Sequence, residues 1–360
     1  MVQKEMLRMG YDEVWMDPWG NVIGLVKGEK GGKSVMFNGH MDHVDTGNPE
    51  EWPYPPFSGK IQKGLLWGRG SADMKATLAS MVYALGMLAE NDIRPPGDIY
   101  MAAVVQEEVG GFGTHKLVQT LQTDFAVIGE ASANRIARGH RGRVEVIVQM
   151  KGESVHASAP QGGVNPLAVL TRFLQRLEEL ELAKEGTFGG STVAPTLVYG
   201  DNSASNVIPN QVTLHLDWRN VPGETAQDVI QQLQPLLNES IAEVDGSTGS
   251  LGVLEKEYRT WTGKSDYFRA VFPSYCLEKR DPLIQQGQEI LSNAFAHPVD
   301  VIVWPFATDG GHLMEAGIPV LGFGPSEIHT LHTVREHISI KMLTEGMLGY
   351  SALALGLGNL

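Results

Sequence analysis

Imidazole and carboxylate side chains follow several short apolar runs of this 360-residue chain, where they could bind metal ions. The residues that share this placement, or lie in a loop beside such a run, are His40, Asp42, Asp73, Glu107, Glu108, Glu130 and His332. Histidine and carboxylate ligands without thiolate suit a borderline divalent ion such as zinc or cobalt. The carboxylates are numerous enough for two ions about 3.5–4 Å apart that share one of them. These residues therefore indicate metal-assisted chemistry.

Glu107 and Glu108 are adjacent, and adjacent acids can divide two tasks between them. Neighbouring residues of a strand point to opposite sides. At the end of the expected strand 98–106, one carboxylate could therefore bind a metal while the other faces the substrate as a general base.

The elements that must position these residues are short buried strands that alternate with amphipathic helices, which is typical of an α/β fold. The expected strands are 34–39, 98–106, 124–129, 300–304 and 318–323. A helix is expected at 74–90, where apolar residues recur at helical spacing. Ligands of an open α/β sheet bind beyond the carboxyl ends of its strands. We therefore expect the metal-type residues to converge on one edge of a mostly parallel sheet.

The middle of the chain has a different pattern. Segments 143–150 and 211–218 alternate apolar and polar residues, as half-exposed antiparallel strands do. A helix at 166–182 opens with the cap Asn165 and a proline, and a second helix follows 222–224. This pattern predicts an α+β domain at 141–256, inserted into an α/β domain formed by 1–140 and 257–360.

Composition excludes several classes of partner. The chain has 42 acidic and 28 basic residues, and a net charge of -14 argues against binding to nucleic acid or to anionic lipid. No apolar run approaches the roughly 18 residues that span a bilayer, and the N-terminus lacks the apolar region of a secretory signal. The single cysteine, Cys276, excludes an internal disulfide and indicates a reducing compartment. We therefore expect a cytoplasmic protein.

Short motifs across nearly the whole chain resemble one known family. The motifs of the expected metal site are HMD at 40–42, GRGSADMK at 68–75, QEEVGG at 106–111, GEAS at 129–132 and HTVRE at 332–336. Those of the inserted region are GHRGRVEV at 139–146, HASAPQGGVNP at 156–166, SNVIPN at 205–210 and LDWRNVPGE at 216–224. Together they resemble the di-zinc aminoacylase and carboxypeptidase metallopeptidases, which include acetylornithine deacetylase and succinyl-diaminopimelate desuccinylase. The tail motifs look most like a branch named as peptidases or selenium-metabolism-linked hydrolases.

The resemblance implies a zinc-peptidase catalytic domain, a ferredoxin-like inserted domain that forms a homodimer, and a role for each motif residue. It implies two divalent ions per chain, zinc or alternatively cobalt, with the ligands His40, Asp73, Glu108, Glu130 and His332. His40 and Glu130 would bind one ion, Glu108 and His332 the other, and Asp73 both. Asp42 matches the residue that orients the histidine ligand. Glu107 matches the general base that takes a proton from the water bridging the metals.

The resemblance also implies residues that act on the substrate. His156 matches a histidine that reaches the active site of a neighbouring subunit and steadies the oxyanion, and Asn206 matches its companion in substrate binding. Arg141, Arg219 and Thr308 match positions that bind a substrate carboxylate in relatives.

Several histidines compete with these assignments or have another reading. His329 and His337 lie close to His332, but the HT-x-x-E pattern favours His332. The remaining histidines without a matching role, which we interpret as surface or packing residues, are His43, His140, His215 and His312. The glycines at 68–70 lack the lysine-serine ending of a phosphate-binding loop.

The sequence therefore predicts metal-dependent hydrolysis of an amide bond in a small N-acyl amino acid or short peptide. A dipeptidase or carboxypeptidase is the alternative, because the same attack by water serves both. A catalytically silent relative that binds peptides is a third hypothesis. Relatives usually carry a few tens of residues before the point where this chain starts, so we also expect a partly uncovered apolar face on the catalytic domain.

Overall fold

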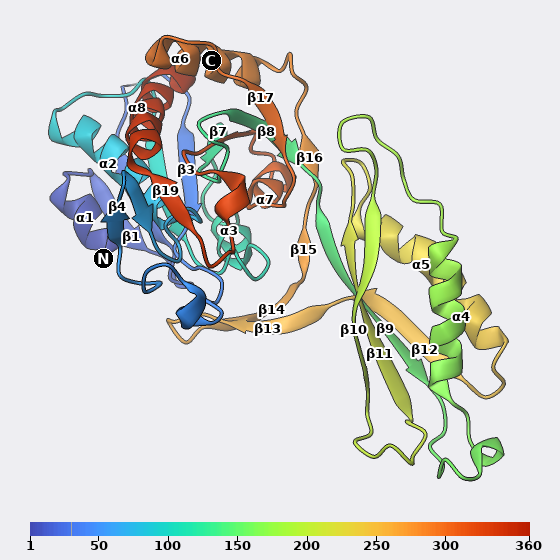
Figure 1. The fold of residues 1–360 in the computed structure, drawn as a ribbon. Coiled ribbons are helices and arrows are strands. Elements are labelled where there is room, and N and C mark those ends of the chain that lie inside the picture. Colours follow the sequence, from blue (N-terminus) through green and yellow to red (C-terminus); the bar gives the residue numbers. More distant parts are fainter. Residues whose placement is uncertain (30) are drawn as a thin grey trace. The chain divides into compact units, whose positions relative to one another are not determined.

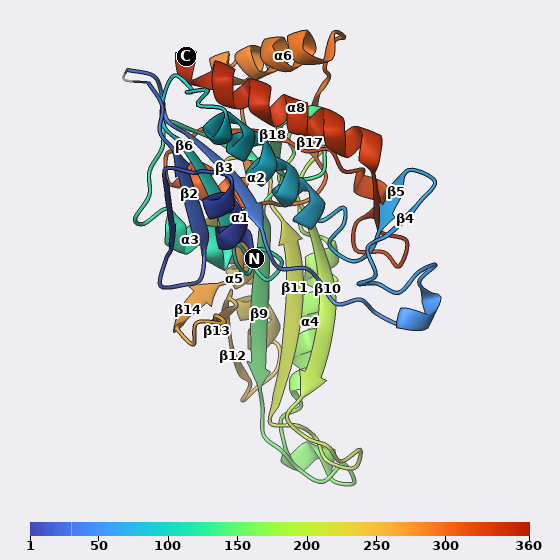
Figure 2. The ribbon, with the colours of Figure 1, turned by 90° about the vertical axis from the view of Figure 1, so that its left-hand side faces the viewer.

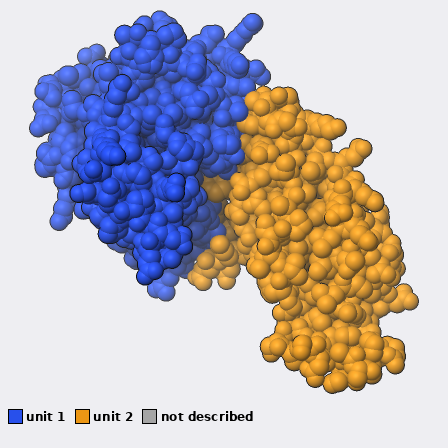
Figure 3. Space-filling model, in the orientation of Figure 1, with its two compact units in different colours: residues 1–140, 258–266, 275–360 blue, residues 141–257, 267–274 orange. Residues whose placement is uncertain are grey.

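The computed structural model describes residues 1–29 and 31–360, which form two compact units (Figure 3). Unit 1 consists of Met1–His140, Tyr258–Asp266 and Tyr275–Leu360. Unit 2 consists of Arg141–Glu257 and Tyr267–Ser274. The first crossing from unit 1 to unit 2 falls directly after a histidine at the end of a strand, at His140.

Unit 1 is built on a nine-stranded mixed sheet (Figure 1). Its strands are β1 (Glu13–Met16), β2 (Val22–Val26), β3 (Val35–His40), β6 (Ile99–Val104), β7 (Phe125–Ile128), β8 (Ile136–His140), β16 (Tyr275–Cys276), β17 (Val301–Trp304) and β18 (Val320–Phe323). The order is β1-β2-β6-β3-β7-β18-β8-β16, and β17 also pairs with β8. The central pairs β6-β3, β3-β7 and β7-β18 are parallel. The five strands expected from apolar runs are confirmed, and the parallel centre brings the carboxyl ends of four strands to one edge.

Helices cover both faces of this sheet. They are α1 (Val2–Arg8), α2 (Lys75–Glu90), α3 (Phe112–Leu117), α6 (Pro282–Phe295), α7 (Gly310–Glu315) and α8 (Ile340–Gly356). One apolar core joins α1, α2, α6 and α8 to the sheet, and a second joins α3 and α7 to its other face. Neighbouring strand residues divide between the two cores: Phe37 of β3 belongs to the first and Met36 to the second. This alternation explains why β3 is buried along its whole length and reads as a continuous apolar run.

The chain also forms two smaller sheets. A three-stranded sheet contains β4 (Lys60–Gln62), β5 (Leu65–Trp67) and β19 (His337–Ser339), in the order β19-β5-β4. A two-stranded ribbon contains β13 (Glu255–Arg259) and β14 (Ser265–Arg269), and the division between the units falls within both strands.

Unit 2 is an antiparallel sheet with two helices. Its strands are β9 (Arg143–Lys151), β10 (Thr192–Gly200), β11 (Gln211–Arg219), β12 (Thr248–Val253) and β15 (Val271–Phe272), and its helices are α4 (Pro166–Glu178) and α5 (Ala226–Ala242). The order is β10-β11-β9-β12, with β15 also paired to β9 (Figure 2). Side chains from both helices and the inner faces of β9 and β11 form one apolar core. The mixed α/β fold predicted from the sequence, with an α+β insertion, is thus confirmed.

Helix α4 is shorter than predicted. The expected helix ran to residue 182, but α4 ends at Glu178. Residues 179–182 alternate polar and apolar side chains, a pattern typical of an extended segment rather than of a helix. Leu180 and Leu182 instead pack against the core of unit 2 from a non-helical segment.

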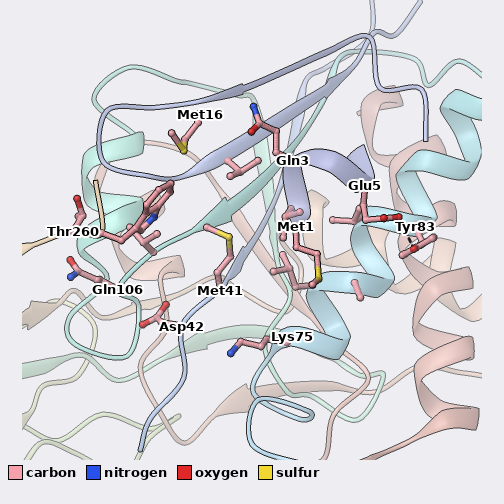
Figure 4. Close-up of a pocket in the computed structure, with 17 residues that line it drawn as sticks. Met1, Gln3, Glu5, Met16, Met41, Asp42, Lys75, Tyr83, Gln106 and Thr260 are labelled. Carbon is pink, nitrogen blue, oxygen red and sulfur yellow. Dashed lines mark hydrogen bonds between the residues drawn. The ribbon is translucent and has the colours of Figure 1, made fainter. Parts of the chain in front are cut away.

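An apolar cavity of about 830 Å³ lies on unit 1 (Figure 4). Met16 and Met41 contribute to its walls, and Asp42 and Lys75 place charged groups along one side. Asp42 thus lines this cavity and also follows β3 directly. Within the described residues, no helix combines the length and the apolar character needed to cross a membrane.

Candidate metal centre

His40 ends β3, the central strand of the parallel part of the sheet, and its side chain is 1% exposed. Its Nε2 lies 2.9 Å from Asp73 Oδ1 and 3.5 Å from Glu130 Oε1. Glu130 follows β7, which pairs in parallel with β3. The sheet therefore brings His40 and Glu130 together as the sequence predicted, because both stand beyond the carboxyl ends of neighbouring parallel strands.

Asp73 joins this pair to a second group of ligands. It lies in the loop before α2, and its two carboxylate oxygens face different histidines. Oδ1 lies beside His40, and Oδ2 lies 3.0 Å from His332 Nε2. The same His332 nitrogen is 3.2 Å from Glu108 Oε2. One carboxylate between two histidines is the arrangement that a ligand bridging two cations requires.

The competing histidines lie outside this cluster. His329 is largely exposed, and its Nε2 is 3.6 Å from Glu327 Oε2. The ring of His337 packs on Trp67 with 4.4 Å between the centroids. The described structure therefore brings His332, and neither of these neighbours, to Asp73.

Glu107 and Glu108 are separated by a turn rather than by the alternation of a strand, so that part of the prediction was wrong. β6 ends at Val104, and Gln106 has a positive φ of 56°. The N–H groups of Gly110 and Gly111 both donate to the carbonyl oxygen of Glu107 and close the turn. Local backbone geometry therefore sets the directions of the two carboxylates.

The turn packs tightly against the start of α7. Gly111 has φ 75°, and a Cβ atom there would meet the His312 ring at 2.5 Å and Asp309 Oδ1 at 2.6 Å. His312 Nε2 also lies 3.0 Å from the carbonyl oxygen of Gly110. Only glycine fits this position, because any side chain would push the two glutamates away from α7.

Asp42 ties this turn to the end of β3. Its Oδ1 accepts the N–H of Glu107 at 3.2 Å, and its Oδ2 accepts the N–H of Glu108 at 3.1 Å. The Nδ1 atom of His40 lies 3.1 Å from the Asp42 carbonyl oxygen and 3.5 Å from its Oδ1. Asp42 therefore lies beside the imidazole, as the resemblance implies, and also fixes the Glu107-Glu108 backbone, which the sequence did not indicate.

The donor set fits divalent metal ions. Two groups of residues each bring their ligand atoms within 4.8 Å of one another. They are His40, Asp73 and Glu108, and His40, Glu107 and Glu130. Bonds of 2.0–2.2 Å to a tetrahedral ion place its ligand atoms about 3.3 Å apart, close to the spacing seen here. Glu108 Oε1 is buried and, across residues 1–29 and 31–360, has no hydrogen-bond partner. A buried carboxylate oxygen without a partner is costly, and a cation would satisfy it.

The raised pKa values of both histidines favour their protonated forms beside the carboxylates. Hydrogen bonds to Asp73 and Glu108 raise the pKa of His332 to about 10. Burial acts to lower the pKa of His40, but contacts with Asp42, Asp73 and Glu130 outweigh it and raise that pKa. Burial likewise acts to raise the pKa of Asp73, and its two histidine partners reverse the direction. Metal binding must displace these protons, so metal affinity falls as pH falls.

Burial raises the pKa of two further carboxyl groups of the cluster. It raises the pKa of Glu107 and raises that of Glu130 to about 7, with the charge of Asp73 as the second cause for Glu130. A buried carboxyl group whose pKa is raised can both take up and return a proton. Glu107 has this property and is not needed to complete either set of predicted ligands.

His156 and Asn206 lie side by side within unit 2. The Nδ2 of Asn206 lies 3.5 Å from Nε2 of His156, and the N–H of Ala157 donates to the Asn206 carbonyl oxygen. His156 Nδ1 is 2.7 Å from the Ser158 hydroxyl. His156 and Asn206 are both exposed. The structure thus brings together the two residues that the resemblance assigned to work on one substrate.

The other predicted substrate-binding residues form hydrogen bonds or ion pairs with other residues of the chain. In unit 2, Arg141 donates to the carbonyl oxygen of Gly190, and Arg219 forms an ion pair with Asp217. In unit 1, Thr308 is fully buried, and its hydroxyl lies 3.0 Å from Nε2 of His140.

Sequence reasoning missed a chain of buried side-chain hydrogen bonds that begins on β3, two residues before His40. Asn38, two residues earlier on β3, donates to the Thr114 hydroxyl at 2.8 Å, which donates to Asp309 Oδ2 at 2.6 Å. All three side chains are nearly inaccessible, and burial raises the pKa of Asp309 to about 7. Asp309 directly follows Thr308, which the sequence did single out, but no spacing rule connects it to Thr114.

A family profile and several known proteins match this chain over most of its length. The profile of peptidase family M20/M25/M40 matches residues 36–355. The N-formyl-4-amino-5-aminomethyl-2-methylpyrimidine deformylase of Bacillus subtilis (strain 168) is 28% identical over 357 residues, which cover 90% of this chain and 80% of that protein. The succinyl-diaminopimelate desuccinylase of Methylobacillus flagellatus is 29% identical over 322 residues, covering 86% of this chain and 80% of that protein.

A solved structure has the same fold. The YXEP protein of Bacillus subtilis, described as a dinuclear metal binding peptidase, superposes with a TM-score of 0.71 at 15% identity. The match covers 98% of this chain and 90% of that one. At this identity the likeness shows the fold alone.

Proposed function

The chain belongs to peptidase family M20/M25/M40, and from that membership and the metal centre we propose that it hydrolyses the amide bond of a small N-acyl amino acid. It is a metal-dependent amide hydrolase. The observation that carries the proposal is the Asp73 carboxylate placed between His40 and His332, each of which has a further carboxylate beside it. The deformylase and desuccinylase relatives, which are named for removing acyl groups, support the substrate class.

We propose that His40, Asp73 and Glu130 hold one divalent ion, and that Asp73, Glu108 and His332 hold the other. When bound, two such ions supply positive charge that polarises a carbonyl oxygen and acidifies water. Zinc is the expected metal and cobalt the alternative, because both suit imidazole and carboxylate ligands. Asp42 holds His40 and the Glu107-Glu108 turn in fixed positions relative to one another.

Glu107 acts as the general base in this proposal. Its carboxylate takes a proton from the attacking water and then delivers that proton to the nitrogen of the leaving amine. Its burial keeps the carboxylate away from bulk water, where the proton would otherwise be lost. On the substrate side, we propose that Arg141, Arg219 and Thr308 recognise the carboxylate of the amino acid.

A dipeptidase or carboxypeptidase is the second candidate. The peptidases for which the family is named favour it, because the same attack by water cleaves a peptide bond. A silent peptide-binding relative would be expected to lack a ligand or the base, whereas His40, Glu107 and His332 are all present in the cluster.

The experiment that tests the function is a substrate panel run with zinc and with cobalt. The panel compares N-formyl, N-acetyl and N-succinyl amino acids with dipeptides as substrates. We expect turnover of acylated amino acids that disappears on chelation and returns when metal is added. Turnover of dipeptides alone would make the protein a peptidase. A protein that binds metal but cleaves no amide in the panel would contradict the proposal.

We also propose that unit 2 forms a homodimer through β10. This strand stands at the end of the sheet order, with β11 as its one partner among the described strands. Its residues Leu197, Val198 and Tyr199 are about half exposed. An exposed apolar edge strand is a ready template for pairing with another chain. We further propose that His156 acts in the active site of the neighbouring copy.

Lysine at two edge positions is expected to break this dimer. In a Leu197→Lys/Tyr199→Lys variant, like charges along the edge oppose pairing of the two copies. Light scattering is expected to give a dimer for the unaltered protein and a monomer for the variant, with loss of activity. The control, Leu167→Lys, changes an exposed leucine on α4 and should remain dimeric. A monomeric unaltered protein would refute the interface.

We propose a cytoplasmic location, because a chain with one cysteine gains no internal disulfide from an oxidising compartment. Fractionation of the native host with an antibody to this protein tests the proposal. Recovery in the secreted fraction would contradict it.

A further inference from the structure

Glu336 is a fully buried carboxylate that the proposed reaction does not use. It follows His332 by four residues and directly precedes β19. Pairing of β19 with β5 continues into this residue, because the Glu336 carbonyl oxygen accepts the N–H of Gly68 at 3.2 Å. The small sheet therefore carries Glu336 to the start of the loop that ends in Asp73.

The Glu336 side chain binds the backbone of that loop. Its Oε1 accepts the N–H of Ala72 at 2.9 Å and the N–H of Asp73 at 3.1 Å. Both contacts cross more than 260 positions of the chain. A single oxygen atom thus holds the peptide group that carries the carboxylate between the two histidines.

The other oxygen of Glu336 pairs with Arg69. Nη1 of Arg69 donates to Oε2, and its Nε donates to the carbonyl oxygen of Asp45 at 3.2 Å. The guanidinium also lies over the Trp52 ring, 5.0 Å from the centroid. Both charged side chains are almost completely buried. The ion pair therefore connects the segment after β3, the loop before α2 and the segment of His332.

A buried ion pair is rarely a source of stability, because removing two charges from water costs about as much as their attraction returns. Its consequence here is geometric. Asp73 must present one oxygen to His40 and the other to His332, so a small shift of its backbone would misplace both. The oxygen that accepts two adjacent N–H groups opposes such a shift, and Arg69 fixes that oxygen in turn.

We propose that Glu336, held by Arg69, is a positioning residue that fixes Asp73 between the two metal sites. This inference rests on the proposed metal centre but does not depend on which amide is cleaved. The acceptor atom for the Asp73 N–H sets metal affinity, whereas removing one partner of the pair destabilises the segment, because the other charge is left buried and unpaired.

Three variants separate these roles, with zinc alone as the probe. Glu336→Ala removes the acceptor and the charge. Glu336→Gln keeps an oxygen for the two N–H groups but leaves Arg69 buried without its partner charge. Arg69→Gln/Glu336→Gln keeps the oxygen and removes both charges. The measurements are the zinc affinity of metal-depleted protein, by competition with a chromogenic chelator, and the midpoint of thermal unfolding without metal.

Asp12 offers a matched control in the same unit. Its Oδ2 accepts the N–H of Lys27 and an N–H of Arg94, both at 2.7 Å, so it too joins an arginine to a backbone amide. Arg94 precedes β6 whereas Glu107 follows it, so this pair lies at the opposite end of that strand from the metal centre. Asp12→Ala is expected to leave zinc affinity unchanged.

Glu336→Ala is expected to weaken zinc binding by about tenfold to a hundredfold, the usual effect of losing a residue that orients a ligand. Glu336→Gln should bind zinc more tightly than Glu336→Ala while unfolding at a lower temperature than the unaltered protein. The double variant should recover part of that thermal loss. If Glu336→Ala does not fold, the glutamine variants still decide, since both must bind zinc within a few-fold of the unaltered protein.

Unchanged zinc affinity in folded Glu336→Ala would overturn the inference, and so would an equal loss in Asp12→Ala. A weakening in Glu336→Gln as large as in Glu336→Ala would also overturn it, because the retained oxygen would then have no effect. Failure of the proposed function has a different signature. There, the unaltered protein binds two zinc ions but cleaves no amide, and the effect of Glu336 on affinity is still measurable.

Discussion

Replacing Glu107 by Gln is expected to leave metal binding intact and to lower kcat by roughly 10²–10⁴-fold, the range that a general base contributes. Glutamine has nearly the same size and can still hydrogen-bond, but it cannot take up a proton. Zinc content and KM should stay close to those of the unaltered protein, because Glu107 completes neither predicted ligand set. Burial raises the pKa of Glu107, so the acid side of the pH–activity profile should also change in the variant.

The adjacent glutamate gives the sharpest comparison for this prediction. Glu108→Gln removes a predicted ligand, so it should lose bound zinc together with activity, whereas Glu107→Gln should lose activity alone. Glu289→Gln, on an exposed position of α6, controls for the loss of one negative charge. Near-normal turnover by Glu107→Gln would remove Glu107 from the mechanism.

Replacing Asp73 by Ala is expected to abolish activity and to prevent tight binding of both ions. Each of its oxygens faces a different histidine, so one truncation removes a ligand from both sites. A ligand that binds only the folded state stabilises it, by about 2.7 kcal/mol at a concentration of 100 Kd. Zinc should therefore raise the unfolding temperature of the unaltered protein and have little effect on that of Asp73→Ala.

Zinc content by mass spectrometry and unfolding curves with and without zinc are the measurements for this prediction. Asp73→Asn keeps one oxygen and should retain at most one ion, which distinguishes a bridging ligand from an ordinary one. Asp245→Asn, an exposed position in unit 2, is the charge control. Two tightly bound ions in Asp73→Ala would show that Asp73 is not the bridge.

The central sheet was predictable because its strands are recognisable in the sequence as short apolar runs. A strand buried on both faces, such as β3, reads as an uninterrupted apolar run, and a polar residue directly after it stands out. His40 and Glu130 belong to this class. Their meeting follows from the parallel pairing of β3 with β7, which the α/β pattern implies.

The parts that could not be predicted depend on contacts between distant residues or on backbone detail. Thr114 and Asp309 are 195 positions apart, and Glu336 reaches Asp73 across 263. No local pattern encodes such a pairing. The Glu107-Glu108 turn depends on a positive φ at Gln106, a residue type that gives no signal for that conformation. Asp42 was assigned to one neighbour by resemblance, while its contacts with two N–H groups emerge only from the fold.

The position of β18 in the sheet has a consequence for how the protein is made. This strand, at Val320–Phe323, lies between β7 and β8, which the ribosome produces almost 200 residues earlier. The strands of unit 2 are complete by Phe272, so that unit can fold while translation continues. The main sheet cannot be completed until β18 has been synthesised, and His332 is synthesised after β18. We therefore expect a chain that is terminated before β18 and the proposed ligand His332 to lack hydrolytic activity.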